Sequence, residues 1–305
     1  MDPTILLQPF QYEFFVRAIL VSVLVGGICG LLGVYIILRG MSYVGHGMSH
    51  AVFGGAVVSY IVGFNFYIGA GIWGFVSAVL INEITRRNKV KADAAIGVVT
   101  TAGFAIGVFL ISTTRSYTRN FEALLFGNIL GITDQDLLVI SVVTAITTAF
   151  IFFFQKRLLF TLFDKETAKV YGIRTDKVEL LFTLILATVV IASMSSIGVT
   201  LLAAAIVAPA ISARVITNNF SKMVIISTIM GVTISFLGMY SSYFFDSASG
   251  STIVLYGAAS FGISSLYAHL RKLYQTHTHG RLSHSHPHIH VKEHKHDHNV
   301  TLNKE

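Results

Sequence analysis

Two histidines inside an apolar stretch are the side chains of this chain best suited to bind a metal ion. His46 and His50 lie four residues apart in the segment 39–55, which is rich in glycine and joins two long apolar runs. Residues at i and i+4 of a helix share one face, so both imidazoles could reach one ion. Imidazole is a common ligand of transition metals, and an ionisable residue inside a membrane span usually marks a functional site. The alternative is that both histidines pack against polar neighbours and bind no ion.

A second group of histidines lies in the polar tail, residues 276–305. Such a tract cannot bury a core and should be disordered without a ligand. Neutral imidazoles at this density favour zinc, copper or nickel. The tail therefore has either incidental metal affinity or a regulatory or buffering role. Its candidate ligands are His277, His279, His284, His286, His288, His290, His294, His296 and His298.

Composition places the chain in a membrane. Of its 305 residues 53% are hydrophobic and 12% charged, whereas soluble domains average about 25% charged. The net charge of +7 is concentrated in short loops and helix ends, which indicates membrane orientation and not nucleic-acid binding. Cys29 is the single cysteine, so neither an intramolecular disulfide nor a cysteine-based zinc cage is possible.

The apolar runs predict an all-α polytopic membrane protein, a bundle of eight or nine transmembrane helices. The predicted spans are 14–38, 42–62, 68–84, 94–111, 137–154, 178–194, 199–216, 222–245 and 251–270. Gly26 and Gly30 have the small-xxx-small spacing that permits close helix approach. Pro209 removes a backbone hydrogen bond and should kink its span. The patch 124–130 is too short to cross a bilayer and is a candidate short or re-entrant helix. Residues 1–275 would form the membrane domain and 276–305 a cytoplasmic tail.

The distribution of basic residues predicts the orientation. With the loop 85–93 in the cytoplasm, alternation puts Arg39, residues 156–177, residues 214–222 and Arg271 on the same side. The other side receives only Arg17, Arg115 and Arg119. This bias supports nine spans, with the N-terminus outside and the C-terminus inside. An eight-span arrangement, with one segment short of a full crossing, stays open.

The loop 155–177 carries six basic residues and the pattern of a short helix. Asp164 can cap its start and Gly172 can end it. The alternative is an ordinary amphipathic surface loop.

The sequence lacks the motifs of several common kinds of enzyme and transporter. No phosphate-binding loop, catalytic triad or H-E-x-x-H motif is present, which argues against an enzyme. The spans also lack the buried carboxylate relay that proton- or sodium-driven transporters usually need.

Taken together, the motifs resemble the membrane permease of manganese/zinc/iron ABC importers over residues 14–272. Members of that family typically have a glycine, an acidic residue and, four residues further on, a Ser-His pair. Ser49 and His50 match this pair, and His46 stands where the family usually has aspartate. The other matching segments are 93–97, 125–128, 163–172 and 198–214 with Pro209-Ala210.

The resemblance implies an ATP-driven importer in the plasma membrane of a prokaryote. Two permease copies would pair with two cytoplasmic ATPase subunits, and an extracellular binding protein would deliver a divalent metal ion. That ion would be the transported substrate and not a permanent cofactor. The coupling helix that docks on the ATPase would include Phe163, Asp164, Glu166, Ala168 and Gly172.

The histidine at position 46 bears on which metal would be carried. Imidazole is a softer ligand than carboxylate, so the His46/His50 pair favours zinc over manganese, with iron also possible. Two other functions stay open. One is a stand-alone secondary zinc transporter, which would work without an ATPase. The other is a metal sensor, which would depend on the histidine-rich tail.

Overall fold

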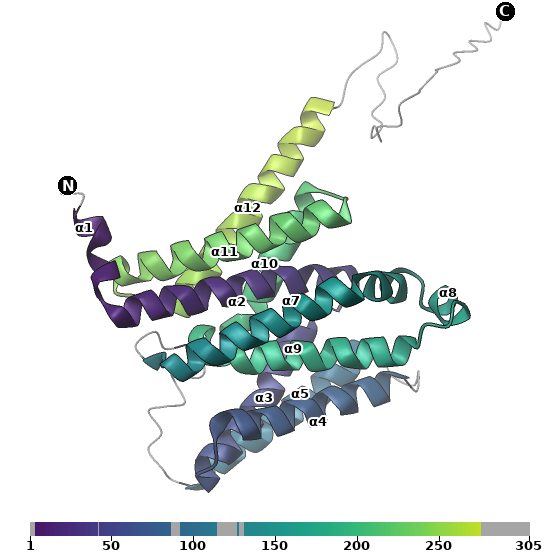
Figure 1. The fold of residues 1–305 in the computed structure, drawn as a ribbon, viewed down its shortest axis with the longest axis horizontal. Helices are drawn as coiled ribbons and strands as arrows, with labels where there is room; N and C mark the ends of the chain where they lie inside the picture. Colours follow the sequence, from purple (N-terminus) through teal and green to yellow (C-terminus); the bar gives the residue numbers. More distant parts are fainter. Residues whose placement is uncertain (1–3, 42, 87–91, 115–126, 128–130, 276–305) are drawn as a thin grey trace, which may run out of the picture. The chain divides into compact units, whose positions relative to one another are not determined.

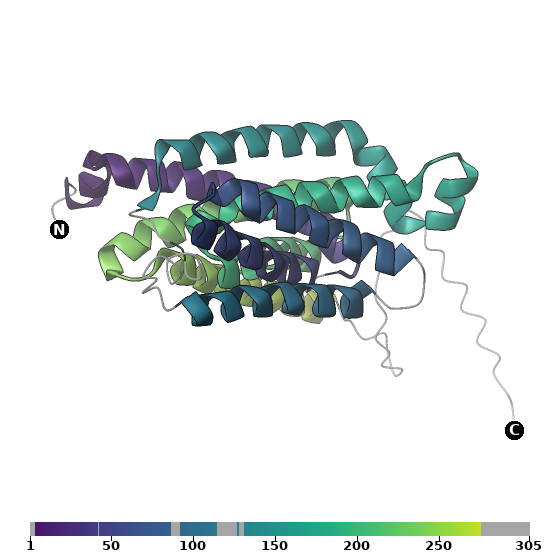
Figure 2. The ribbon, with the colours of Figure 1, turned by 90° about the horizontal axis from the view of Figure 1, so that it is seen from below.

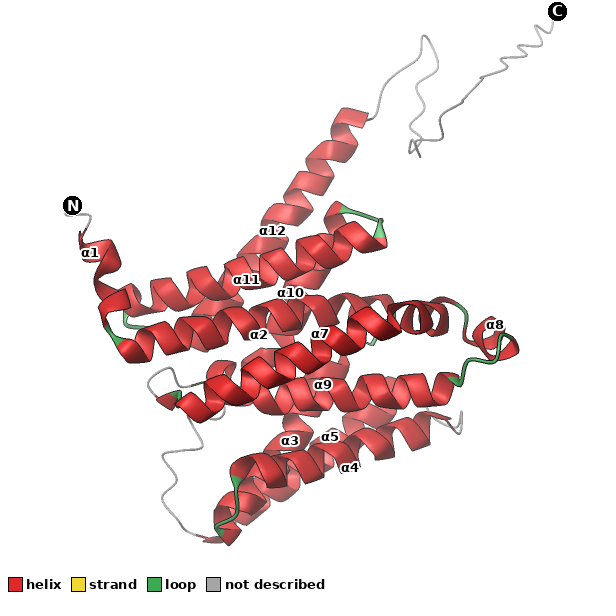
Figure 3. Ribbon diagram, in the orientation of Figure 1, coloured by secondary structure: helices red, strands yellow, loops and turns green. Residues whose placement is uncertain are grey.

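The computed structural model describes residues 4–41, 43–86, 92–114, 127 and 131–275, and these are built from helices joined by loops (Figures 1 and 3). The chain forms two compact units, Met1–Ser265 and Leu266–Glu305, and the account below concerns the first. The tail histidines and the predicted short helix at 124–130, apart from Gly127, lie outside the described residues. The elements are α1 Thr4–Leu7, η1 Gln8–Gln11, α2 Glu13–Leu38, α3 Tyr43–Val62, α4 Phe66–Arg86, α5 Ala92–Thr114, α7 Asp134–Phe163, α8 Lys165–Val170, α9 Thr175–Ile197, α10 Val199–Ile216, α11 Phe220–Phe245 and α12 Ser249–Gln275.

Each predicted span coincides with one long helix, and the all-α polytopic fold is confirmed. By length and composition, 7 helices of the described chain can cross a membrane: α2, α4, α5, α7, α9, α11 and α12. The apolar part of α10, Leu201–Ile216, is shorter. Helix α3 carries His46, His50 and several glycines, which lower its hydropathy.

Contacts between helix ends agree with the alternation of nine spans. Arg17 near the start of α2 pairs with Asp134 at the start of α7, at 3.2 Å. The Tyr67 hydroxyl at the start of α4 donates a hydrogen bond to Asp136. The starts of α2, α4 and α7 therefore lie at one end of the bundle, as alternation requires. At the other end, the guanidinium of Arg39 lies 4.8 Å from the ring of Phe182, which is near the start of α9.

Helix α2 is the centre of one half of the bundle, where it lies beside α10 and α11 (Figure 1). A Cβ atom on Gly26 would lie 2.3 Å from the carbonyl oxygen of Gly231, and one on Gly30 would lie 2.4 Å from that of Ser227. The Ser227 hydroxyl donates to the carbonyl of Gly30 at 2.6 Å. The small-residue spacing predicted from the sequence thus does bring two helices into close contact.

Helix α3 occupies the corresponding position in the other half, in contact with α4, α5, α9 and α10. A Cβ atom on Gly47 would lie 2.3 Å from the Ile96 side chain, and one on Gly54 would lie 2.2 Å from the carbonyl oxygen of Gly103. Glycine at these two positions lets α5 approach the backbone of α3. The histidine pair is therefore placed inside the helical bundle.

Helix α10 continues through Pro209 from Val199 to Ile216. Proline has no N–H group, so the carbonyl of Ala205 loses its usual helical donor. The kink expected at Pro209 stays a prediction.

Candidate functional site

The two histidines of α3 face each other across one helical turn. Their Nε2 atoms are 3.2 Å apart, within hydrogen-bonding distance. The rings meet edge to face, with centroids 4.4 Å apart. Both side chains are half-buried. The spacing predicted a shared face, and the structure places the two imidazoles on it.

This separation suits two ligands of one metal ion. In a tetrahedral zinc site with Zn–N bonds of about 2.05 Å, two nitrogens stand about 3.3 Å apart. The Nε2 atoms of His46 and His50 are already at 3.2 Å. Among the described residues, no group of three or more histidine, cysteine or acidic side chains is arranged to hold a metal. Within the described chain, a metal ion at this position would therefore have two protein ligands, His46 and His50.

Neighbouring residues contact the backbone of His46 and the ring of His50. The Ser49 hydroxyl, fully buried, donates to the carbonyl of His46 at 2.8 Å. The ring of Phe104 on α5 meets the His50 ring edge to face at 4.9 Å. The Nδ1 atom of His50 is buried and has no hydrogen-bond partner within the described chain. Sequence reasoning missed Phe104, because no local pattern reveals which residue of another helix will meet a given histidine.

Arg39 is a second residue whose environment the sequence did not reveal. It follows the last residue of α2, and its Nη2 atom is buried without a hydrogen-bond partner in the part of the chain described. Burial lowers the pKa of Arg39, and the negative charge of Glu179 acts in the opposite direction. The guanidinium lies over the ring of Phe182, as described above, so an aromatic face supplies part of its contact.

The segment predicted to form a capped short helix does so. Asp164 is the N-cap of α8: its carboxylate accepts from the backbone N–H of Thr167 at 2.9 Å and from the Thr167 hydroxyl. These hydrogen bonds lower the pKa of Asp164. Gly172 ends the helix at φ +79°, with its N–H bonded to the carbonyl of Lys169. The N–H of Ile173 bonds to the carbonyl of Ala168 at 3.0 Å, which completes a Schellman motif.

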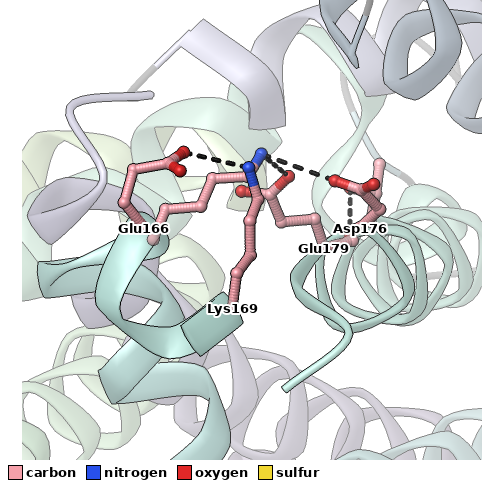
Figure 4. Close-up of polar contacts among 6 residues, drawn as sticks. Glu166, Lys169, Asp176 and Glu179 are labelled. Carbon is pink, nitrogen blue, oxygen red and sulfur yellow. Dashed lines mark hydrogen bonds and ion pairs between the residues drawn. The ribbon is translucent and has the colours of Figure 1, made fainter. Parts of the chain in front are cut away.

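Ion pairs fix α8 to the start of α9. The Nζ atom of Lys165 lies 2.7 Å from a carboxylate oxygen of Glu179 and 3.8 Å from one of Asp176. Glu166 and Lys169 pair along α8 at 2.9 Å (Figure 4). Ala168, in the middle of α8, is completely buried. Helix α8 is therefore held against α9 and is more than an isolated surface loop.

Three large apolar side chains are exposed on this segment, beside the charged side chains of Glu166 and Lys169. Phe163, Val170 and Tyr171 are 69%, 85% and 75% exposed. Figures 1 and 2 show α8 beyond the ends of the long helices, on the side where α7 ends and α9 begins. The sequence pattern pointed to the cap and the terminating glycine, but not to Val170 and Tyr171, which present the apolar surface.

Long apolar helices around a helix with paired histidines, together with a capped helix beyond the bundle, define a polytopic membrane permease. The model of the ABC 3 transport family matches residues 11–268, and this chain belongs to that family. The resemblance to divalent-metal ABC importer permeases is thereby confirmed.

Similar proteins bear names that refer to different metals. The chain is 36% identical to the manganese transport system membrane protein MntC of Listeria monocytogenes, over 85% of this chain and 92% of that protein. It is 33% identical to a probable iron transport system membrane protein of Haemophilus influenzae, over 87% of this chain and 93% of that one. The solved structure of PsaBC from Streptococcus pneumoniae in complex with Fab matches with a TM-score of 0.78 and 35% identity, covering 88% of this chain and 99% of that chain.

Proposed function

We propose that this chain is the permease subunit of an importer that moves a divalent transition metal ion into the cell, powered by a separate ATPase. The observation that carries the proposal is the 3.2 Å separation of the Nε2 atoms of His46 and His50 on a helix inside the bundle. Two imidazoles and water bind an ion loosely enough for release, as transport requires.

Zinc is the substrate we favour over manganese. Two imidazole ligands are softer than the carboxylate and imidazole pair that manganese prefers. The relatives named for manganese and iron transport support a divalent metal as the substrate class. Histidine at position 46 is the feature on which the preference for zinc depends, and the histidines of the tail would favour the same ion.

The proposed partners are an ATPase, a binding protein and a second permease copy. Helix α8, with Phe163, Val170 and Tyr171 exposed, would dock on the cytoplasmic ATPase. An extracellular binding protein would supply the ion at the opposite end, and a second permease copy would complete the assembly. The N-terminus would then lie outside the plasma membrane and the C-terminus in the cytoplasm, as the distribution of basic residues predicts.

Uptake by membrane vesicles tests the proposal. One set of vesicles would carry the permease with its cognate ATPase and binding protein, and a second set would carry the permease alone. Both sets would be given zinc or manganese. We expect uptake only in the complete system, with zinc preferred. Uptake by the permease alone would overturn the importer assignment in favour of a secondary transporter. A preference for manganese would overturn only the choice of ion.

A further inference from the structure

A pocket lined by basic residues lies between the end of α7 and the start of α9. It has a volume of about 430 Å³, within the range of about 300–1,000 Å³ that is usual for ligand sites. Its cations are Arg157 on α7 and Arg174 and Lys177 at the start of α9, all exposed. No carboxylate forms an ion pair with any of the three within the described chain. The pocket therefore presents positive charge that the described residues leave unpaired.

The arrangement of α9 keeps its acidic residues away from the pocket. Positions 174, 177, 178 and 181 recur at intervals of three and four and share one helical face. Asp176 and Glu179 lie on the other side of the helix (Figure 4). There the Nζ atom of Lys165 lies 3.8 Å from a carboxylate oxygen of Asp176 and 2.7 Å from one of Glu179. An anion in the pocket would therefore meet the basic face of α9 alone.

Apart from these cations, the pocket is lined by Phe154, Tyr171, Gly172, Ile173, Val178 and Leu181, and Leu181 is 42% exposed. Phe154, Ile173, Val178 and Leu181 give this part of the wall an apolar surface, and Tyr171 adds a hydroxyl group. Arg157 also lies over the ring of Phe154, 5.6 Å from its centroid. A ligand that matched the whole pocket would carry a negative head and an apolar chain.

Helix length puts this pocket at the membrane boundary. Helix α7 has 30 residues, about 45 Å, whereas the hydrocarbon core of a bilayer is about 30 Å thick. The start of α7 is held level with Arg17 of α2 through Asp134. Roughly twenty residues then cross the core, which brings Phe154 and Arg157 to the level of the lipid headgroups.

We propose that this pocket binds the phosphate headgroup of an anionic phospholipid from the cytoplasmic leaflet. Arg157, Arg174 and Lys177 contact the phosphate, and an acyl chain lies along Val178 and Leu181. The assignment to the cytoplasmic leaflet rests on the orientation given under the proposed function. Tyr171 lines this pocket and also belongs to the surface proposed to dock on the ATPase. An acidic side chain of the ATPase would satisfy the cations but would leave Val178 and Leu181 without an apolar partner, so lipid fits the pocket better.

Native mass spectrometry of the transporter purified with its ATPase tests this site. The probes are phosphatidylglycerol, phosphatidylcholine and inorganic phosphate. A basic residue near an anionic lipid surface contributes about fivefold in affinity, so the triple variant R157Q/R174Q/K177Q should bind phosphatidylglycerol about a hundredfold more weakly. The matched control K156Q/R214Q/K222Q removes three exposed basic residues outside the pocket and should bind like the wild type.

Three results would overturn the assignment. One is equal retention of phosphatidylglycerol by the triple variant and the wild type. Another is displacement of that lipid by inorganic phosphate at equal concentration, which would point to a soluble anion. The last is lipid retention only after the ATPase is removed, which would assign the pocket to the protein interface. The mass spectrum measures bound lipid and does not depend on metal uptake. These outcomes would therefore stand even if the importer assignment were wrong.

Discussion

At the scale of single residues, the sequence predicted what depends on one helix and missed what depends on two. Helical periodicity places His46 and His50 on one face, and in the structure their Nε2 atoms are 3.2 Å apart. The ring of Phe104 reaches His50 only because α5 packs closely on α3. The burial of Arg39 against Phe182 depends likewise on how α2 meets α9. Such contacts between helices have no local signature in the sequence.

Replacement of His50 by alanine should reduce metal uptake to the background of vesicles without permease, because one of the two proposed protein ligands would be lost. Uptake of radioactive zinc in the complete vesicle system measures this. His269→Ala is the matched control, since His269 is exposed on α12 and should tolerate the change. Normal uptake by the His50 variant at wild-type expression would contradict a role in the pathway.

Replacement of His46 by aspartate should move the preference from zinc toward manganese, because a carboxylate is a harder ligand than imidazole. Competition between the two ions in one uptake assay gives the ratio directly. The same ratio in the variant and the wild type would mean that position 46 does not select the ion.

At the scale of elements, caps and close contacts decide where each helix begins, ends and packs. The sequence predicted both ends of α8, because Asp164 and Gly172 are local signals. It did not predict that Lys165 would join α8 to Glu179 on α9, since an ion pair across 14 residues depends on the path of the turn between them.

Replacement of Asp164 by alanine should loosen the first turn of α8, because the carboxylate accepts from both the backbone and the hydroxyl of Thr167. We expect ATP hydrolysis to continue with less metal moved per ATP. The ratio of uptake to hydrolysis in reconstituted transporter measures this coupling. Asp164→Ser keeps a capping side chain and should keep most of the coupling. Full coupling in the alanine variant would show that the cap is not needed for docking.

The pKa shift of Asp164 gives this cap a pH dependence. The hydrogen bonds from Thr167 lower the pKa of Asp164 below its value in an unfolded chain. The contribution of the cap is therefore present at neutral pH and is lost as the pH falls through the lowered pKa.

Replacement of Gly54 by alanine should separate α3 from α5, because the new methyl group would lie 2.2 Å from the carbonyl oxygen of Gly103. Overpacking of this kind costs about 1–3 kcal/mol. Thermal unfolding of the purified protein in detergent measures the loss. Gly97→Ala is the control, since a Cβ atom there meets nothing within 4 Å. Equal melting temperatures for the two variants would mean that the α3–α5 contact yields easily.

At the scale of the whole molecule, the apolar runs alone predicted the long helices of the described chain and their order. The order of neighbours was not predictable, because near-uniform hydrophobicity gives a helix little preference for any one face. Glycine and serine supply that preference: Gly26 and Gly30 bring α11 against α2, and Gly47 and Gly54 bring α5 against α3. Only the first of these two pairs has the small-xxx-small spacing that predicts close helix contact from the sequence.

Cysteine labelling at the two ends of α11 tests the predicted alternation of the spans. Cys29 is buried, so it should not react in the wild type. We expect Ser247→Cys to react with an impermeant maleimide on intact cells and Lys222→Cys to react only after permeabilisation, because Lys222 lies in the first turn of α11 and Ser247 lies just beyond its last residue. Reaction of both from the same side would contradict nine spans.

The hydrogen bond between the two imidazoles has a consequence for how long an ion stays. One of the two Nε2 atoms carries the shared hydrogen, and both must present lone pairs to a metal. If His50 is the donor, its hydrogen would move to Nδ1 when an ion binds, because a neutral imidazole carries one N–H group. Nδ1 is buried and has no partner within the described chain in either tautomer. The cost that a bound ion would add is therefore the lost hydrogen bond between the two rings, and recovery of that bond would favour departure of the ion.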